Sequence, residues 1–267
     1  LAWALLYSLW QGLLIFGFLY VLLKSIPSAS ARLKYNLSLG AFVALFAWFA
    51  YTWVSQYYKL IGTMVYITTP SVANGPVAMN TVQAVATPQA DGPVLHSLWP
   101  GIERYYSLII LMYAIGLLCM LFRFLVNMGR VHALRSQDIM LPSPDWAAFV
   151  SKWQARFNIS RPVKLFLSAR TTVPVMLGAL KPVILLPVAT LNHLSTEQVE
   201  AILLHELAHI RRHDYLLNIL QTIGEVILFF NPFVWLISAV IRRERELCCD
   251  DLVVENAADP LPYARAL

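Results

Sequence analysis

Residues 205–250 read HELAHIRRHDYLLNILQTIGEVILFFNPFVWLISAVIRRERELCCD, and this stretch constrains the fold most strongly. Charged and metal-ligating residue types gather at its two ends, whereas residues 215–241 between them carry a single charge, Glu225. Asn231-Pro232 interrupts the apolar run near its middle, so each half is short for a membrane span. We predict a membrane-associated helical hairpin over residues 215–241, which returns the chain to the side where it began. The buried core of a soluble domain is the alternative.

The first end of this stretch, His205-Glu206-Leu207-Ala208-His209, is an HExxH motif. Histidines four residues apart project from one face of a helix, so both imidazoles can bind one zinc ion. Glu206 lies beside them, where a carboxylate can take a proton from water. Ser195 and Gln198 form a capping-box signature that predicts where this helix starts. The motif predicts one zinc ion per chain, with Glu206 as the catalytic base.

The second end of the stretch supplies candidates for a third zinc ligand, since a catalytic zinc needs three protein ligands and an open position for water. Glu246 is favoured, because Asp250 follows one helical turn later and can accept the free N–H of a zinc-bound imidazole. Glu244 with Asp251 offers a similar pairing and stays open as an alternative. In either case the hairpin must bring the two motifs to the same side.

Other ligand patterns fit less well. Arg212 and Tyr215 stand where the metzincin extension needs Gly and His, so that class of protease is excluded. His213 is expected at the membrane interface and not on the metal. Cys248 and Cys249 are expected to pack in the core, because thiolates would fill the position that water needs.

Upstream of the HExxH helix, the pattern predicts a small α+β domain. A helix is expected over residues 145–157, followed by strands over 163–167, 172–177 and 183–186, the last two forming a hairpin. Pro174 cannot donate to a strand ladder, so its strand should begin there or lie at a sheet edge. We predict that this strand binds an extended substrate through residues Val173, Pro174, Val175, Met176 and Leu177.

The rest of the chain is that of a membrane protein: 58% of the 267 residues are hydrophobic and only 13% are charged. Spans are predicted over residues 1–23, 37–54 and 105–126, so that residues 1–126 form a transmembrane domain. A signal peptide is the alternative for the first span, although no basic residue precedes it. The chain has three cysteines, and two of them are adjacent in sequence. This odd number and spacing do not fit a disulfide framework.

The distribution of basic residues predicts the orientation. The short connection after the first span holds three of them without an acid, and three more stand near the end of the third span or just after it: Lys24, Arg32, Lys34, Arg123, Arg130 and Arg135. Basic connections stay in the cytoplasm, so residues 55–104 are predicted to be an irregular external loop and residues 127–267 a cytoplasmic domain. The net charge of +5 is thereby explained by topology, and no nucleic-acid motif accompanies it.

The two motifs, together with Asn231-Pro232-Phe233-Val234-Trp235 between them and Ser8-Leu9-Trp10-Gln11-Gly12 in the first span, resemble the BlaR/MecR-type membrane zinc metallopeptidases. The resemblance implies a gluzincin-like domain in which His205, His209 and Glu246 bind zinc and Glu206 is the base. The best-known members are antirepressors that couple an extracellular β-lactam sensor to cleavage or inactivation of a cytoplasmic repressor. This sequence departs from them, since it contains no S-x-x-K serine and ends at Leu267, and we expect it to be a fragment.

These features predict a multi-pass plasma-membrane zinc endopeptidase that, on a stimulus, cleaves a cytoplasmic protein or itself. Its expected partners are membrane lipids and a protein substrate such as a transcriptional repressor, with a homodimer left open and no direct nucleic-acid binding. Two other functions remain: a housekeeping protease for membrane-protein quality control, and a receptor whose zinc module does not hydrolyse peptides.

Overall fold

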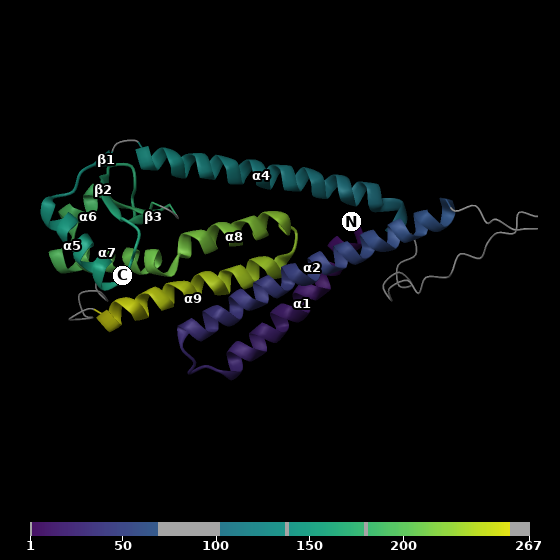
Figure 1. Cartoon of the computed structure of the whole chain (residues 1–267). Helices are drawn as coiled ribbons and strands as arrows, with labels where there is room; N and C mark the ends of the chain where they lie inside the picture. The colour runs from purple at the N-terminus through teal and green to yellow at the C-terminus, as the bar shows by residue number, and fades with distance from the viewer. Residues whose placement is uncertain (1, 69–101, 137–138, 179–180, 257–267) are drawn as a thin grey trace, which may run out of the picture.

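The computed structural model describes residues 2–68, 102–136, 139–178 and 181–256 (Figure 1). Long helices form an elongated helical part, and a small sheet with short helices sits at one end of it. The order of elements along the chain determines this shape, because the sheet and its helices lie between the last membrane helix and the C-terminal hairpin.

Among the described residues, three helices are long and apolar enough to cross a membrane, which confirms the three predicted spans. They are α1 (Ala2–Ser25), α2 (Ala31–Thr68) and α4 (Tyr106–Ser136), the last preceded by a short 3₁₀ helix at Ile102–Tyr105. Each helix outlasts its predicted span, and the predicted domain boundary after residue 126 falls inside α4 without a break.

The expected irregular loop over residues 55–104 is wrong at its start. Residues 55–68 continue α2, and the first proline that could stop the helix is Pro70. Residues 69–101 of that loop lie outside the described residues.

The domain at the end of the helical part contains a four-stranded sheet with the order β1-β2-β4-β3. The strands are β1 (Ile139–Met140), β2 (Lys164–Ser168), β3 (Val175–Leu177) and β4 (Val183–Pro187). β2 and β4 are parallel, whereas β1 and β3 each add antiparallel at an edge. The predicted hairpin and its edge strand are confirmed, but the edge strand is shorter than expected, because it begins only after Pro174.

Helices α5 (Pro144–Arg156), α6 (Val188–His193) and α7 (Thr196–Arg212) complete this domain. One apolar core joins α5, α7 and the inner strands, with Ile184, Leu186, Leu203 and Leu207 fully buried. The capping box at the start of α7 is present in both directions: Ser195 accepts from the backbone of Gln198, and the Gln198 side chain accepts from the backbone of Ser195.

The apolar stretch after HExxH forms two antiparallel helices, α8 (Asp214–Ile227) and α9 (Pro232–Asn256), so the predicted helical hairpin is confirmed. α9 packs against α1 and α2, with Leu45, Leu228, Val234 and Ile237 fully buried in the shared core. Figure 1 shows α1, α2 and α9 side by side, with α4 running along the far side of α8.

The tip of the hairpin is hydrogen-bonded to α1 and to α4. Asn231 donates from Nδ2 to the carbonyl of Ser8 at 2.8 Å, and the Tyr113 hydroxyl donates to the carbonyl of Ile227 at 3.0 Å. Close contact between Gly12 and Phe233 lets α9 approach α1 directly, since a Cβ at Gly12 would lie 3.0 Å from that of Phe233. The hairpin therefore runs alongside the membrane helices for most of their length.

Candidate metal centre

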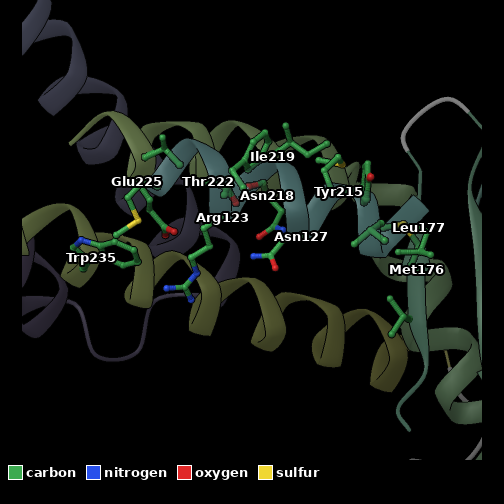
Figure 2. A pocket seen from close by; sticks show the side chains of 16 residues that line it. Arg123, Asn127, Met176, Leu177, Tyr215, Asn218, Ile219, Thr222, Glu225 and Trp235 are labelled. Atoms are coloured by element: carbon green, nitrogen blue, oxygen red, sulfur yellow. Dashed lines mark hydrogen bonds between the residues drawn. The ribbon is translucent and has the colours of Figure 1, made fainter. Parts of the chain in front are cut away.

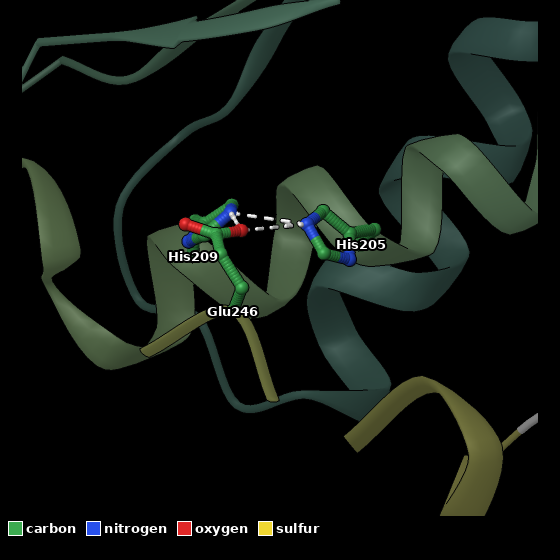
Figure 3. A group of neighbouring side chains, drawn as sticks. All are labelled: His205, His209 and Glu246. Carbon is green, nitrogen blue, oxygen red and sulfur yellow. Dashed lines mark hydrogen bonds and ion pairs between the residues drawn. The ribbon is translucent and has the colours of Figure 1, made fainter. Parts of the chain in front are cut away.

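His205, His209 and Glu246 converge at the junction of α7 and α9 (Figure 3). The two Nε2 atoms are 3.2 Å apart, and each lies 3.5 Å from Oε2 of Glu246. One ligand atom from each residue falls within 4.8 Å of the other two, a spacing that could hold a single metal ion. Because two ligands come from one helix turn and the third from a distant helix, the hairpin fold creates the group.

A carboxylate contacts the outer nitrogen of each imidazole. Asp250 Oδ1 lies 3.2 Å from Nδ1 of His205, as the spacing of Glu246 and Asp250 predicted. Asp214 Oδ2 lies 2.9 Å from Nδ1 of His209, and this contact was not predicted. Carboxylates in this position orient the rings, fix the tautomer and leave both Nε2 atoms free for a metal.

Asp214 is positioned by a turn for which the sequence gives only a weak signal. α7 ends at Arg212, the next residue His213 has a φ of 62° in the left-handed region, and α8 starts at Asp214. The turn folds Asp214 back under His209, and its position five residues after that histidine was the available signal. Arg212 adds an ion pair, with Nε 3.4 Å from Asp214 Oδ2.

Glu206 is buried next to the histidines. Burial raises the pKa of its carboxyl group, and the nearby positive charges of His209 and His205 oppose that rise. A carboxylate with a raised pKa is better matched to proton transfer near neutral pH than an exposed glutamate is.

Acidic groups surround His209. Burial lowers the pKa of this imidazole, but hydrogen bonds to Asp214, Cys249 and Glu246 outweigh burial and raise it to about 12. The same contacts hold the pKa of Glu246 well below its usual range, through hydrogen bonds to His205 and His209. The group therefore favours positive charge, as a metal cation would supply.

Cys249 makes a second possible metal group with His209 and Asp214. Its Sγ lies 3.3 Å from His209 Nδ1, on the opposite side of the ring from Glu246. Burial raises the pKa of this thiol to about 11, and the contact with His209 opposes that rise. Cys248 packs as expected, in the core that α9 shares with α1 and α2. Cys249, in contrast, contacts the site at Nδ1 of His209, the ring nitrogen that faces away from Glu246.

The other candidates lie elsewhere. Glu244 is buried, and its Oε2 has no hydrogen-bond partner among the described residues, whereas Asp251 is exposed. Neither belongs to a metal-binding group in the part of the chain that the structure describes. His213 is exposed, in the turn between α7 and α8.

The predicted substrate strand borders a groove. Met176 and Leu177 of β3 line one end of a cavity of about 460 Å³ between α4 and α8, which continues to Glu225 and Trp235 (Figure 2). Val175 lines it as well, whereas Val173 lies outside the strand and is exposed. The structure thus places the edge strand beside α7, but a substrate role for these residues remains a prediction.

Comparison with known proteins agrees with the resemblance seen in the motifs. The regulatory protein BlaR1 of Bacillus licheniformis is 34% identical over 83 residues, which are 31% of this chain and 14% of that protein. The methicillin resistance mecR1 proteins of Staphylococcus aureus and Staphylococcus epidermidis are each 24% identical over 162 residues, 60% of this chain and 28% of the relative. The chain thus matches less than a third of the length of these relatives. The family described as BlaR1 peptidase M56 matches residues 5–267, and the chain therefore belongs to this family of membrane metallopeptidases.

Proposed function

We propose that this protein is a membrane-bound zinc endopeptidase with a gluzincin-like site, which cleaves a cytoplasmic protein of the repressor kind, or itself, in response to a stimulus. One observation carries the proposal: two imidazole nitrogens and a carboxylate oxygen converge within 4.8 Å, with a buried glutamate beside them. The stimulus and the repressor-like substrate rest on the similarity to BlaR1 and mecR1 proteins alone.

The donor set fits zinc. Two nitrogens and one oxygen, with carboxylates behind both imidazoles, are a set that zinc accepts while keeping a fourth position open. His205, His209 and Glu246 would hold one ion per chain. When bound, zinc supplies Lewis-acid chemistry that polarises a carbonyl group and lowers the pKa of water toward about 7.

The protein itself supplies the proton transfer. Glu206 takes a proton from the attacking water as the new C–O bond forms, and delivers it to the leaving amine as the C–N bond breaks. β3 is the outermost strand on its side of the described sheet, so an extended peptide can add to it as a strand and place its scissile bond next to α7. Asp250 and Asp214 keep the two imidazoles oriented throughout.

The site belongs to the cytoplasmic side in this proposal. The basic connection between α1 and α2 lies at the same end of the helices as the metal group, since the Arg212 guanidinium sits 4.8 Å above the ring of Tyr35 in α2. Basic connections of this kind stay in the cytoplasm. A substrate for this site is therefore expected in the cytoplasm or at the inner membrane surface.

The test is to separate metal binding from hydrolysis in the full chain, purified in lipid nanodiscs. Glu206→Gln should retain one zinc per chain and lower cleavage of the chain itself, or of a co-expressed candidate repressor, by about 10²–10⁴-fold. Glu246→Ala should lose zinc as well as cleavage. Glu200→Gln, on the same helix, is the matched control and should behave as the wild type.

Four outcomes would contradict the proposal in different ways. Cleavage that persists in Glu206→Gln would show that Glu206 is not the catalytic base. Zinc that stays in Glu246→Ala but leaves in Glu244→Ala changes the third ligand. Equal signalling by wild type and Glu206→Gln, with no cleavage product under any stimulus, favours a receptor, and cleavage of misfolded membrane proteins alone favours a housekeeping protease.

A further inference from the structure

Polar residues recur every fourth position along one stripe of α9. Ser238, Arg242, Glu246 and Asp250 are each four residues apart, so neighbouring members lie on the same side of the helix, about 6 Å further along its axis. The cytoplasmic half of the stripe, Glu246 and Asp250, faces the histidines of α7. The other half lies among membrane helices, where polar groups are costly unless they serve a purpose.

That second half is bound to α8. Arg242 Nη1 donates to Oε1 of Glu225 at 2.7 Å in an ion pair. Gln221, one turn before Glu225, donates to the carbonyl of Ser238 at 3.1 Å and to Glu225 Oε1 at 3.4 Å. These contacts fix both the rotation of α9 about its axis and its height against α8.

Glu225 lies at membrane depth. The hairpin tip contacts Ser8, which is 17 residues from the end of α1 at Ser25, or about 26 Å of helix. This approaches the thickness of a hydrocarbon core, about 30 Å. Glu225 is only two residues from the end of α8, it is buried, and it lines the far end of the groove shown in Figure 2. In the ion pair the Glu225 side chain is 11% exposed and that of Arg242 is 43% exposed, so burial is confined to the glutamate side.

The two halves of the stripe are linked through rigid elements. α8 continues from α7 through the single residue His213, and Asp214 at its start is bound to His209. Glu225 therefore sits on the arm that carries the histidines, whereas Arg242 sits on the arm that carries Glu246, one helical turn away from it. A rotation of α9 that broke the pair would turn the Glu246 carboxylate away from both imidazoles.

We propose that Glu225 and Arg242 are positioning residues for the metal centre: their ion pair holds α9 in the rotation that presents Glu246 to His205 and His209. The inference rests on the proposed zinc site. It also makes the metal centre sensitive to movements of the membrane helices, because any displacement that separates α8 from α9 at the pair also withdraws a metal ligand.

The experiment measures zinc affinity of the full chain in nanodiscs by competition with a chelator. Glu225→Gln and Arg242→Gln should each weaken zinc binding about 10-fold or more, the size of effect that outer partners of metal ligands have. The charge reversal Glu225→Arg with Arg242→Glu restores a pair, and it should recover most of the affinity. Arg243→Gln removes the same charge one residue away, at an exposed position of α9, and should leave the affinity unchanged.

Circular dichroism of each zinc-free variant reports whether the helices form. Single variants with wild-type zinc affinity would overturn the proposal. So would a charge reversal that stays unfolded or zinc-deficient, because a role limited to the pair is restored when the pair is restored. Loss of zinc from the wild type itself would instead overturn the proposed function, as would its retention in Glu246→Ala.

Discussion

At His209, carboxylates act on both ring nitrogens: Asp214 holds Nδ1 from the start of α8, and Glu246 faces Nε2 from α9. The first contact fixes which nitrogen carries the proton, so that the other is free to bind a metal. The two residues therefore serve one ring in different ways.

Asp214→Asn tests this division of roles. The amide keeps the shape of the buried side chain but removes the charge, so zinc affinity should fall by about 10–100-fold while the fold persists. Chelator competition and thermal unfolding are the measurements, and Asp251→Asn, at an exposed position of α9, is the control. Equal affinities in both variants would assign Asp214 a structural role only.

The pH dependence of zinc binding follows from the raised pKa of His209. Its protonated form stabilises the metal-free fold, fully so below the unfolded value of about 6.5, and this contribution is lost as pH rises through the folded value of about 12. Zinc must displace that proton, so log Kd should fall by about one for each pH unit between pH 6 and 8. Isothermal titration across this range checks the slope. A flat profile would mean that His209 is neutral before zinc binds.

Among the elements, the α8–α9 hairpin does most to create the site, because it brings Glu246 to the HExxH helix. Its tip relies on close contact with α1 at Gly12 and on the hydrogen bond between Asn231 and Ser8. A side chain at Gly12 would strike Phe233 and Asn231, and Asn231 cannot yield without losing that bond.

Gly12→Leu should therefore destabilise the protein by about 1–3 kcal/mol, the usual effect of overpacking. Gly17→Leu is the matched control on the same helix, since a Cβ there meets nothing within 4 Å. Thermal unfolding in nanodiscs, with zinc retention as a second readout, distinguishes them. The same shift in both variants would show that the tip does not need close packing.

Local patterns were enough to predict the three spans, the capped α7 and the hairpin, because each has its own signal in apolar length, capping residues or an Asn-Pro break. Glu246 and Asp250 were predicted from helical spacing, and the structure brings both to the histidines. Asp214 was missed because its contact depends on a left-handed turn at His213, a conformation that is uncommon for residues other than glycine and that helical spacing does not indicate. The Glu225–Arg242 pair was missed because it depends on the register of two helices, which spacing within each helix cannot supply.

For the whole molecule, the metal group lies at one end of the helical part, at the depth of the connection between α1 and α2. Lys24, Arg32 and Lys34 flank that connection, so its placement in the cytoplasm would fix the side of the site as well. Topology therefore determines which proteins can reach the site.

Cysteine labelling of intact cells with a membrane-impermeant maleimide tests the orientation, in a Cys119→Ser background because Cys119 is exposed whereas Cys248 and Cys249 are buried. A cysteine at Asn74, between α2 and α4, should be labelled from outside. One at Lys152, exposed on α5, should react only after the membrane is permeabilised. The reverse pattern would place the metal centre outside the cell. A cytoplasmic repressor could then no longer be its substrate, whereas zinc binding and the Glu225–Arg242 pair would be unaffected.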